Sequence, residues 1–167
     1  RISTETRQKV IKCINTLDYK VNNIARSLKT KQTHTIGFIA PEISEEFFMR
    51  IAKGAENILQ QNGYSLIICN ANDNLKDETN RIKLLQEKQV DGVIIIPSTN
   101  EGKNFQILRQ AGIPVVLADR LVHNFEANTV LVDNINGAYS AIEHIINLGA
   151  KRIGFIGGKE ISVAQER

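Results

Sequence analysis

Two short apolar runs decide the fold of this chain: Ile36-Gly37-Phe38-Ile39-Ala40 and Val93-Ile94-Ile95-Ile96. A strand that exposes one face to water alternates apolar and polar residues, whereas these runs are apolar at nearly every position. They therefore predict strands that are buried on both faces, as in the middle of a parallel sheet.

Outward from these runs, the sequence alternates between short apolar strands and amphipathic helices. Further strands are predicted at residues 64–69, 115–118, 129–132 and 152–156, and helices at residues 44–62, 77–88, 103–110 and 134–148. The buried side of the first of these helices is expected to carry Phe47, Phe48, Ile51, Ala55, Ile58 and Leu59. Such alternation predicts an α/β fold with a doubly wound parallel sheet.

Ligands of doubly wound sheets bind beyond the carboxyl ends of the strands. In this sequence those positions are residues 41–48, 70–74, 97–100, 119–120 and 133–134. They are rich in hydrogen-bonding side chains and include two aromatic rings. This composition suits a polyhydroxylated or heterocyclic small molecule.

The first 35 residues differ from the rest in charge. They hold eight Lys or Arg against two acidic residues, a net charge of +6, whereas the remainder holds 13 basic and 16 acidic residues, a net charge of −3. Ser3 is a candidate cap for a helix that ends near residue 18, residues 21–28 are a candidate for a two-turn helix, and residues 29–35 are a polar linker. The charge predicts a polyanion contact at this end, with a solvated helix surface as the alternative.

The sequence contains no pattern for catalysis, and we expect neither an enzyme nor a bound cofactor or metal. It has no phosphate-binding loop and no nucleophile elbow, and its three histidines are scattered. Cys13 and Cys69 lie in unrelated segments, which predicts buried, inert thiols and a reducing compartment. No run of 18 apolar residues occurs, so no membrane span is expected.

Several segments together resemble the lactose-repressor family, which includes the ribose and purine repressors. The N-terminal matches are Ile2-Ser3, Glu5-Thr6-Arg7, Val10, Leu17, Tyr19, Val21-Asn22 and Ala25-Arg26-Ser27-Leu28. The later matches are Thr35-Ile36-Gly37, Val90-Asp91-Gly92-Val93-Ile94, Gly112-Ile113-Pro114-Val115-Val116, Asp119-Arg120, Asp133-Asn134, Gly137-Ala138, Gly149 and Arg152-Ile153. Their order and spacing carry the resemblance, which covers essentially the whole chain.

The resemblance implies a truncated periplasmic-binding-protein-like core, preceded by the end of a helix-turn-helix headpiece and a hinge helix. Residues 1–20 would then be the end of the headpiece, residues 21–34 the hinge helix and linker, residues 35–131 the first lobe of the effector-binding core, and residues 132–167 the incomplete start of a second lobe. The chain would thus be an excerpt of a longer protein.

The resemblance further implies a homodimer that binds operator DNA. Paired hinge helices would enter the minor groove, with Leu28 as the wedge that opens a base step. The residues that would line the groove or touch phosphates are Asn22, Ala25, Arg26 and Ser27. For Leu28 the alternative is a buried contact to the core.

For the effector, the resemblance points to residues of both lobes. Asp119 matches an acid that hydrogen-bonds effector hydroxyls, Arg167 matches a basic residue of the second lobe, and Ser162 is a weaker candidate. Phe47 and Phe48 occupy the place where the family stacks an effector ring. Because adjacent helix positions diverge by about 100°, only one of the two rings is expected in the core, and we favour Phe48 as the ligand ring.

Arg120 is the competing candidate beside Asp119, since it could equally hold Asp119 in place by an ion pair. Together with the composition of the strand ends, the resemblance implies a ligand-responsive transcriptional repressor of the cytoplasm and nucleoid, with a sugar or nucleobase-like effector between two lobes. The alternatives are a solute-binding protein of transport, which shares the core fold, and a family regulator controlled by a protein corepressor.

Overall fold

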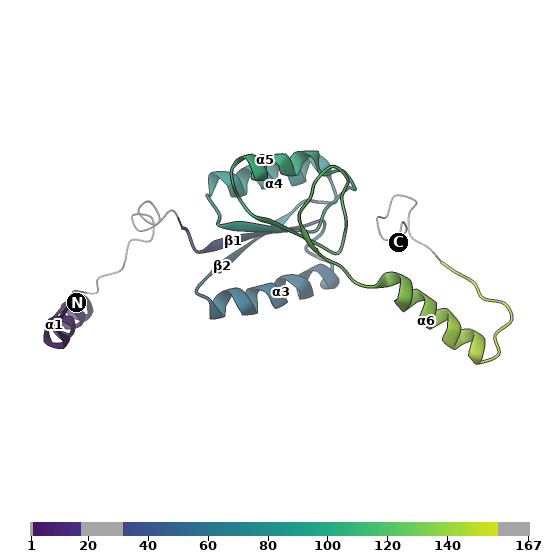
Figure 1. Cartoon of the computed structure of the whole chain (residues 1–167), viewed down its shortest axis with the longest axis horizontal. Coiled ribbons are helices and arrows are strands. Elements are labelled where there is room, and N and C mark those ends of the chain that lie inside the picture. Colours follow the sequence, from purple (N-terminus) through teal and green to yellow (C-terminus); the bar gives the residue numbers. More distant parts are fainter. Residues whose placement is uncertain (1, 18–31, 157–167) are drawn as a thin grey trace. The chain divides into compact units, whose positions relative to one another are not determined.

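A computed structural model of the chain describes residues 2–17 and 32–156, and the chain divides into two compact units, residues 1–33 and 34–167 (Figure 1). Helix α1 (Thr4–Thr16) belongs to the first unit. As the sequence predicted, Ser3 caps it: the Ser3 hydroxyl accepts a hydrogen bond of 3.2 Å from the backbone N–H of Thr6. The helix predicted at residues 21–28 lies outside the described residues.

Helix α1 leaves its apolar side chains in water. Val10, Ile11, Ile14 and Leu17 are all exposed, and so is Cys13. The expectation that both thiols are buried is therefore wrong for Cys13, because residues 2–17 contain a single helix, which cannot bury its own apolar face. Cys69 is buried in the sheet, and burial raises the pKa of its thiol.

The second unit is built on a five-stranded parallel sheet, which confirms the predicted fold class. Its strands are β1 (Thr35–Ala40), β2 (Ser65–Asn70), β3 (Gly92–Ile95), β4 (Val115–Ala118) and β5 (Asn128–Val130). They are ordered β2-β1-β3-β4-β5, and every neighbouring pair is parallel. All carboxyl ends consequently lie at one edge of the sheet.

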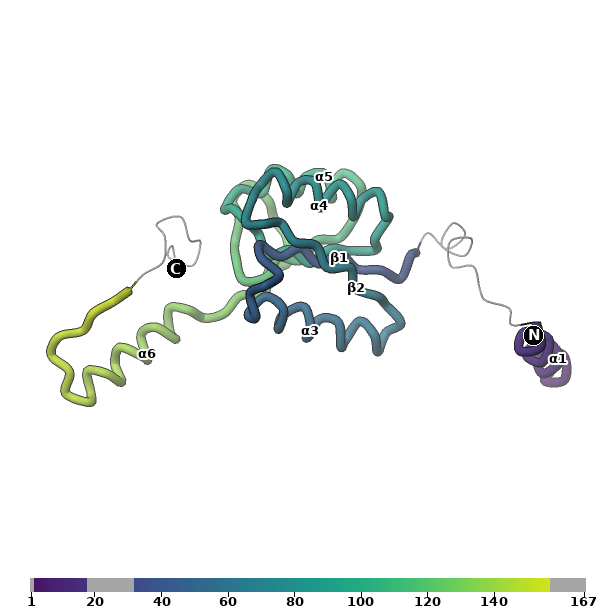
Figure 2. The backbone as a smooth tube through the Cα atoms, turned by 180° about the vertical axis from the view of Figure 1, so that it is seen from behind, coloured from purple at the N-terminus to yellow at the C-terminus, as the bar shows by residue number. Residues whose placement is uncertain are grey.

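Helices cover both faces of this sheet. Helix α3 (Glu46–Gln61) packs on one face, and helices α4 (Leu75–Glu87) and α5 (Gln106–Gln110) pack on the other (Figures 1 and 2). Because side chains alternate along a strand, β1 serves both layers: Phe38 and Ala40 join the core under α3, and Ile39 joins the core under α4 and α5. The central strands are thus buried on both faces, whereas the edge strands β2 and β5 are partly exposed.

Helix α3 buries a narrower stripe than the sequence predicted. Phe48, Ala52, Ala55 and Leu59 follow helical spacing and are buried or half-buried, but the side chain of Phe47 is 48% exposed and that of Ile58 is 60% exposed. A helix on a sheet buries one stripe only. Phe47 and Ile58 lie three turns apart on a neighbouring stripe, which faces away from the sheet, so their predicted burial is wrong.

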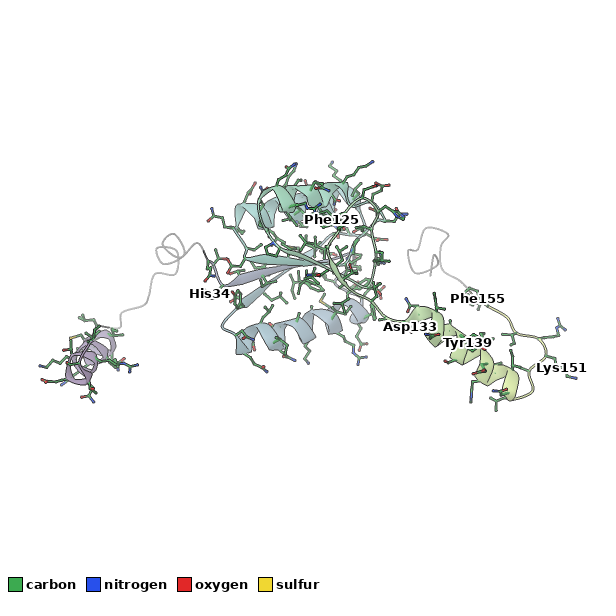
Figure 3. All side chains as sticks on the ribbon, viewed as in Figure 1. His34, Phe125, Asp133, Tyr139, Lys151 and Phe155 are labelled. Atoms are coloured by element: carbon green, nitrogen blue, oxygen red, sulfur yellow. The ribbon has the colours of Figure 1, made fainter. Side chains whose placement is uncertain are left out.

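The segment after β5 forms a helix but no further strand. Asp133 caps α6 (Asn134–Asn147) by accepting a 3.1 Å hydrogen bond from the backbone N–H of Asn136. The strand predicted at residues 152–156 is absent, and Phe155 is 86% exposed there (Figure 3). A strand needs a neighbour to pair its backbone groups, and the described residues offer none at this place. No helix within residues 2–17 and 32–156 combines the length and apolarity that a bilayer span requires.

Candidate functional site

The carboxyl edge of the sheet carries a strained residue, Asp119, directly after β4. Its φ is +64°, a left-handed conformation that is costly for any residue with a side chain. A hydrogen bond of 2.9 Å from its N–H to the carbonyl of Val130 holds it there. The Asp119 side chain is only 17% exposed, so its carboxylate is fixed at the end of the sheet.

Arg120 is the centre of the polar contacts at this edge. Its Nη1 donates a 2.8 Å hydrogen bond to the carbonyl of Pro97, after β3. Its Nε lies 3.7 Å from Oδ2 of Asp119, its Nη1 lies 3.9 Å from Oδ1 of Asp73, and its guanidinium carbon lies 5.9 Å from the ring centroid of Phe48. With 19% of its side chain exposed, Arg120 links the ends of β3 and β4, the loop after β2, and helix α3.

The loop after β2 brings Asp73 to this edge. Asn72 and Asp73 both adopt left-handed backbone conformations, with φ of 52° and 46°. The N–H of Asp73 donates to the carbonyl of Pro41 at 2.7 Å, and Asn74 then caps α4 with its side-chain oxygen. In the loop after β1, hydrogen bonds from Ser44 hold the pKa of the Glu42 carboxyl below its usual range.

Glu78 of α4 carries a buried carboxylate next to the segment that follows β3 at this edge. Its side chain is fully buried; Oε2 accepts a 2.7 Å hydrogen bond from the backbone N–H of Ser98, and Oε1 accepts one of 2.7 Å from Nδ2 of Asn104. Burial raises the pKa of Glu78, and these hydrogen bonds and the positive charge of Arg120 offset part of that rise.

The sequence analysis did not single out Glu78, although a signal was present. Glu78, Ile82 and Leu85 recur at helical spacing, so the carboxylate lies on the apolar stripe of α4. A charge on such a stripe is rarely buried without partners and therefore marks a special environment.

Of the predicted effector residues, the structure brings Phe48, Asp119 and Arg120 together. Phe47 contacts Phe48 edge to face at 5.5 Å, but it lines a separate hollow of about 510 Å³ with Glu46, Arg50 and Ile51. Ser162 and Arg167 lie outside the described residues, as do the DNA-binding candidates Asn22, Ala25, Arg26, Ser27 and Leu28. The roles assigned to all of these residues stay predictions.

The arrangement offers three kinds of contact to a small ligand. Asp119 supplies acceptors, Arg120 supplies donors, and Phe48 supplies a flat apolar face. In residues 2–17 and 32–156, no three His, Cys, Asp or Glu side chains converge in a way that could hold a metal ion. The contacts that Asp119, Arg120 and Phe48 offer at this edge are hydrogen bonds and ring stacking.

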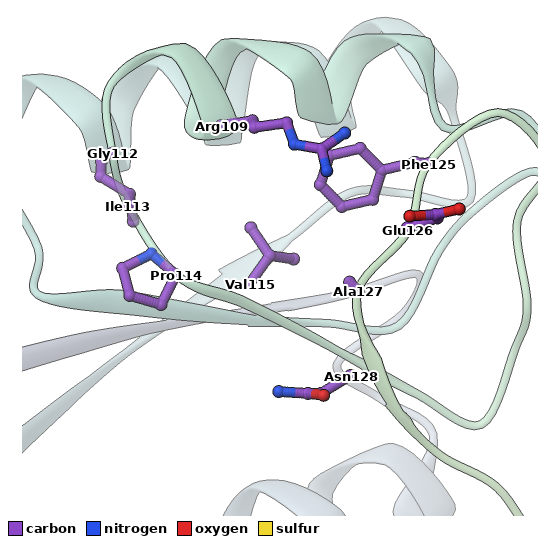
Figure 4. Close-up of a pocket in the computed structure, with 9 residues that line it drawn as sticks. All are labelled: Arg109, Gly112, Ile113, Pro114, Val115, Phe125, Glu126, Ala127 and Asn128. Carbon is purple, nitrogen blue, oxygen red and sulfur yellow. The ribbon is translucent and has the colours of Figure 1, made fainter.

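A pocket of about 610 Å³ lies at the other end of the strands (Figure 4). Val115 and Asn128, which begin β4 and β5, line it, and Arg109 lies 5.8 Å from the ring centroid of Phe125 at its rim. Because the amino ends of the strands form this pocket, it is separate from the edge that carries Asp119.

Comparison with known proteins identifies the family. The sequence pattern of periplasmic binding proteins and the sugar-binding domain of the LacI family matches residues 33–167. The chain belongs to this family, as the resemblance of its motifs predicted.

Its relatives include regulators of transcription. The HTH-type transcriptional regulator RegA of Clostridium acetobutylicum is 38% identical over 150 residues, which cover 89% of this chain and 45% of the relative. The ribose operon repressor of Halalkalibacterium halodurans is 34% identical over 167 residues, which cover 99% of this chain and 49% of the relative. The chain thus spans about half the length of the curated relatives it matches.

Solved structures show the same architecture. A periplasmic binding protein/LacI transcriptional regulator from Alkaliphilus metalliredigens, complexed with D-xylulofuranose, is 32% identical with a TM-score of 0.68, over 80% of this chain and 48% of that one. The lac repressor dimer bound to operator has a TM-score of 0.83 at 22% identity, over 98% of this chain and 50% of that one. At that identity the second likeness supports the fold alone.

Proposed function

We propose that the protein that carries this chain is a transcriptional repressor whose affinity for operator DNA is switched by a small polyhydroxylated effector. The observation that carries the proposal is the cluster of Asp119, Arg120 and Phe48 at the carboxyl edge of a LacI-family sugar-binding domain. The effector would favour one arrangement of two lobes and thereby shift the population of the DNA-binding state. Arg167 and Ser162 remain the candidates for contacts from the second lobe.

The basic first 35 residues support the DNA-binding part of the proposal. They carry a net charge of +6, and the curated relatives that match across them are regulators of transcription. Neutralised phosphates release counterions, so operator binding should weaken steeply as salt rises. In this scheme residues 22–28 contact the minor groove, and the protein acts in the cytoplasm on the nucleoid.

A homodimer follows from the same scheme, because an operator read by twin hinge helices requires two-fold symmetry. Exposed apolar side chains of the first lobe are candidates for its interface: Phe47 and Ile58 on α3, and Ile68 on the edge strand β2. Sedimentation of the intact protein should give a dimer or a tetramer, and a monomer with and without DNA at micromolar concentration would contradict the scheme.

The effector site is tested by Asp119→Ala in the intact protein. A site built to hydrogen-bond hydroxyls loses about 1–3 kcal/mol when one buried partner is removed, which is about 5- to 150-fold in affinity. We therefore expect Asp119→Ala to lose its response to sugar while operator binding in the absence of sugar is retained. Calorimetry with D-ribose, D-xylulose and cellobiose gives the affinities, and gel-shift titration gives operator binding.

The outcomes separate the proposal from its alternatives. Sugar binding without any operator binding would favour a solute-binding protein, and operator binding that only a protein partner enhances would favour a corepressor-controlled regulator. Unchanged sugar affinity in Asp119→Ala would remove Asp119 from the site.

A further inference from the structure

One peptide group, between Pro97 and Ser98, lies between two charged side chains. Its N–H donates to Oε2 of Glu78 at 2.7 Å, and its carbonyl accepts from Nη1 of Arg120 at 2.8 Å. Both groups belong to the same planar unit, so any rotation of that peptide changes both hydrogen bonds together. The peptide dipole also points its positive end at the carboxylate and its negative end at the guanidinium.

Glu78 is the fixed end of this chain of contacts. It lies in the first turn of α4, fully buried, on the stripe that also holds Ile82 and Leu85. Its other oxygen accepts a 2.7 Å hydrogen bond from Asn104, so both carboxylate oxygens are held by the segment between β3 and α5. A carboxylate with two short hydrogen bonds in a buried place has little freedom to move.

Arg120 is the end that faces the ligand edge. Its ion-pair contacts to Asp119 and Asp73 are long, at 3.7 Å and 3.9 Å, and only the bond to the Pro97 carbonyl is short. That carbonyl therefore does most to set where the guanidinium lies relative to Phe48 and Asp119.

We propose that Glu78 is a positioning residue for Arg120, because it fixes the Pro97–Ser98 peptide in the orientation that presents a carbonyl to the guanidinium. Glu78 touches no ligand itself. The consequence for affinity rests on the proposed function, since it requires an effector at the edge that Arg120 occupies. The effect of Glu78 on the position of Arg120, through the Pro97–Ser98 peptide, does not depend on the proposed function.

The test compares Glu78→Ala with two matched variants in the intact protein. Glu78→Ala leaves the N–H of Ser98 without its acceptor, so the peptide is free to turn. Glu78→Gln keeps an oxygen for Ser98, and its amide nitrogen can donate to Asn104 once the Asn104 amide rotates. Asn104→Ala removes a hydrogen bond of the same 2.7 Å length from Glu78 and leaves the peptide between Glu78 and Arg120 untouched.

Crystal structures of the four proteins give the readout that needs no ligand. We expect the guanidinium of Arg120 to leave the Pro97 carbonyl in Glu78→Ala and to keep it in wild type, Glu78→Gln and Asn104→Ala. An unmoved Arg120 in a folded Glu78→Ala protein overturns the proposal. If Glu78→Ala does not fold, Glu78→Asp replaces it, because the shorter side chain draws the carboxylate back by one methylene and should displace the same peptide.

Calorimetry with D-ribose, D-xylulose and cellobiose gives the second readout. For whichever sugar wild type binds, Glu78→Ala should raise the dissociation constant about tenfold or more, as loss of a hydrogen bond to a charged group does, and Glu78→Gln should restore it to within about threefold. Asn104→Ala should lower the melting temperature without changing the affinity. Equal loss of affinity in Asn104→Ala and Glu78→Ala would show a merely structural role. If wild type binds none of the three sugars, the ligand class of the proposed function is in error, and the crystal structures decide the positioning role.

Discussion

Helices α4 and α6 are similar in length and in their N-terminal caps, but they differ in how much of their surface is buried. They have 13 and 14 residues, and each begins at a side chain that accepts hydrogen bonds from its first turn, Asn74 for α4 and Asp133 for α6. Yet α4 buries Glu78, Ile82 and Leu85 completely, and α6 buries none of its residues, leaving Tyr139 66% exposed (Figure 3). Sequence-local signals thus set where a helix starts and stops, whereas its contribution to stability depends on the layer it covers.

The largest expected effect comes from truncating matched apolar residues of the two helices. In the 167-residue chain, Leu85→Ala should lower the free energy of unfolding by about 2–5 kcal/mol, because it opens a cavity under α4. Ile146→Ala, at a position that is 54% exposed, should change it by no more than about 0.5 kcal/mol. Urea unfolding followed by circular dichroism measures both, and equal losses would show that α6 packs on a layer of its own.

Removing the caps should sharpen the same contrast at a smaller scale. Asn74→Ala should lower the stability of the sheet by about 1 kcal/mol, since α4 and the sheet unfold together. Asp133→Ala should leave the unfolding transition of the sheet unchanged, and it should reduce the protection of backbone amides from hydrogen exchange only in α6. Amide hydrogen exchange resolves the two regions, and a cooperative loss over both helices in Asp133→Ala would contradict this division.

The two helices should also differ in the sign of their pH dependence. Burial raises the pKa of Glu78 above its ordinary value of 4.5, so its contribution to stability is complete below that value and is lost as pH rises through the raised pKa. Hydrogen bonds from Asn136 lower the pKa of Asp133 below 3.8, so its contribution is present above that value and is lost as pH falls through the lowered pKa.

Unfolding titrations against pH measure this difference. In Glu78→Gln, the free energy of unfolding should decline less as pH rises above 4.5. In Asp133→Asn, the loss of stability at acid pH should become smaller for α6 alone. A profile of Glu78→Gln that matches wild type throughout would mean that Glu78 has the same pKa in the folded and unfolded chain.

The central strands could be predicted almost residue by residue, because burial on both faces leaves a continuous apolar run in the sequence. Val115–Ala118 is observed as predicted, and β3 differs by a shift of one residue at each end. Residues 152–156 carry a similar apolar pattern and form no strand. Strand pairing is a non-local interaction, so an apolar run predicts a strand only where a neighbouring strand is present.

The candidate site was predictable in its members and not in its geometry. Asp119 and Arg120 follow a predicted strand, and topology alone places them at the carboxyl edge. The position of the Arg120 guanidinium depends on which way the Pro97–Ser98 peptide faces, and that orientation depends on a carboxylate 20 residues earlier in the chain. Such a dependence leaves no periodic trace in the sequence.

The strand order has a consequence for synthesis on the ribosome. All five strands come from one uninterrupted stretch, residues 35–130. Neighbours in the sheet are either consecutive strands of the chain or, for β1 and β3, strands separated by one other strand. Once this stretch has left the exit tunnel, all four pairings between these strands can form, because every strand that takes part in them lies within it. Domains fold as units from the N-terminal side during translation. The sheet can therefore form while α6 is still being made, and α6 leaves the ribosome after the sheet has folded.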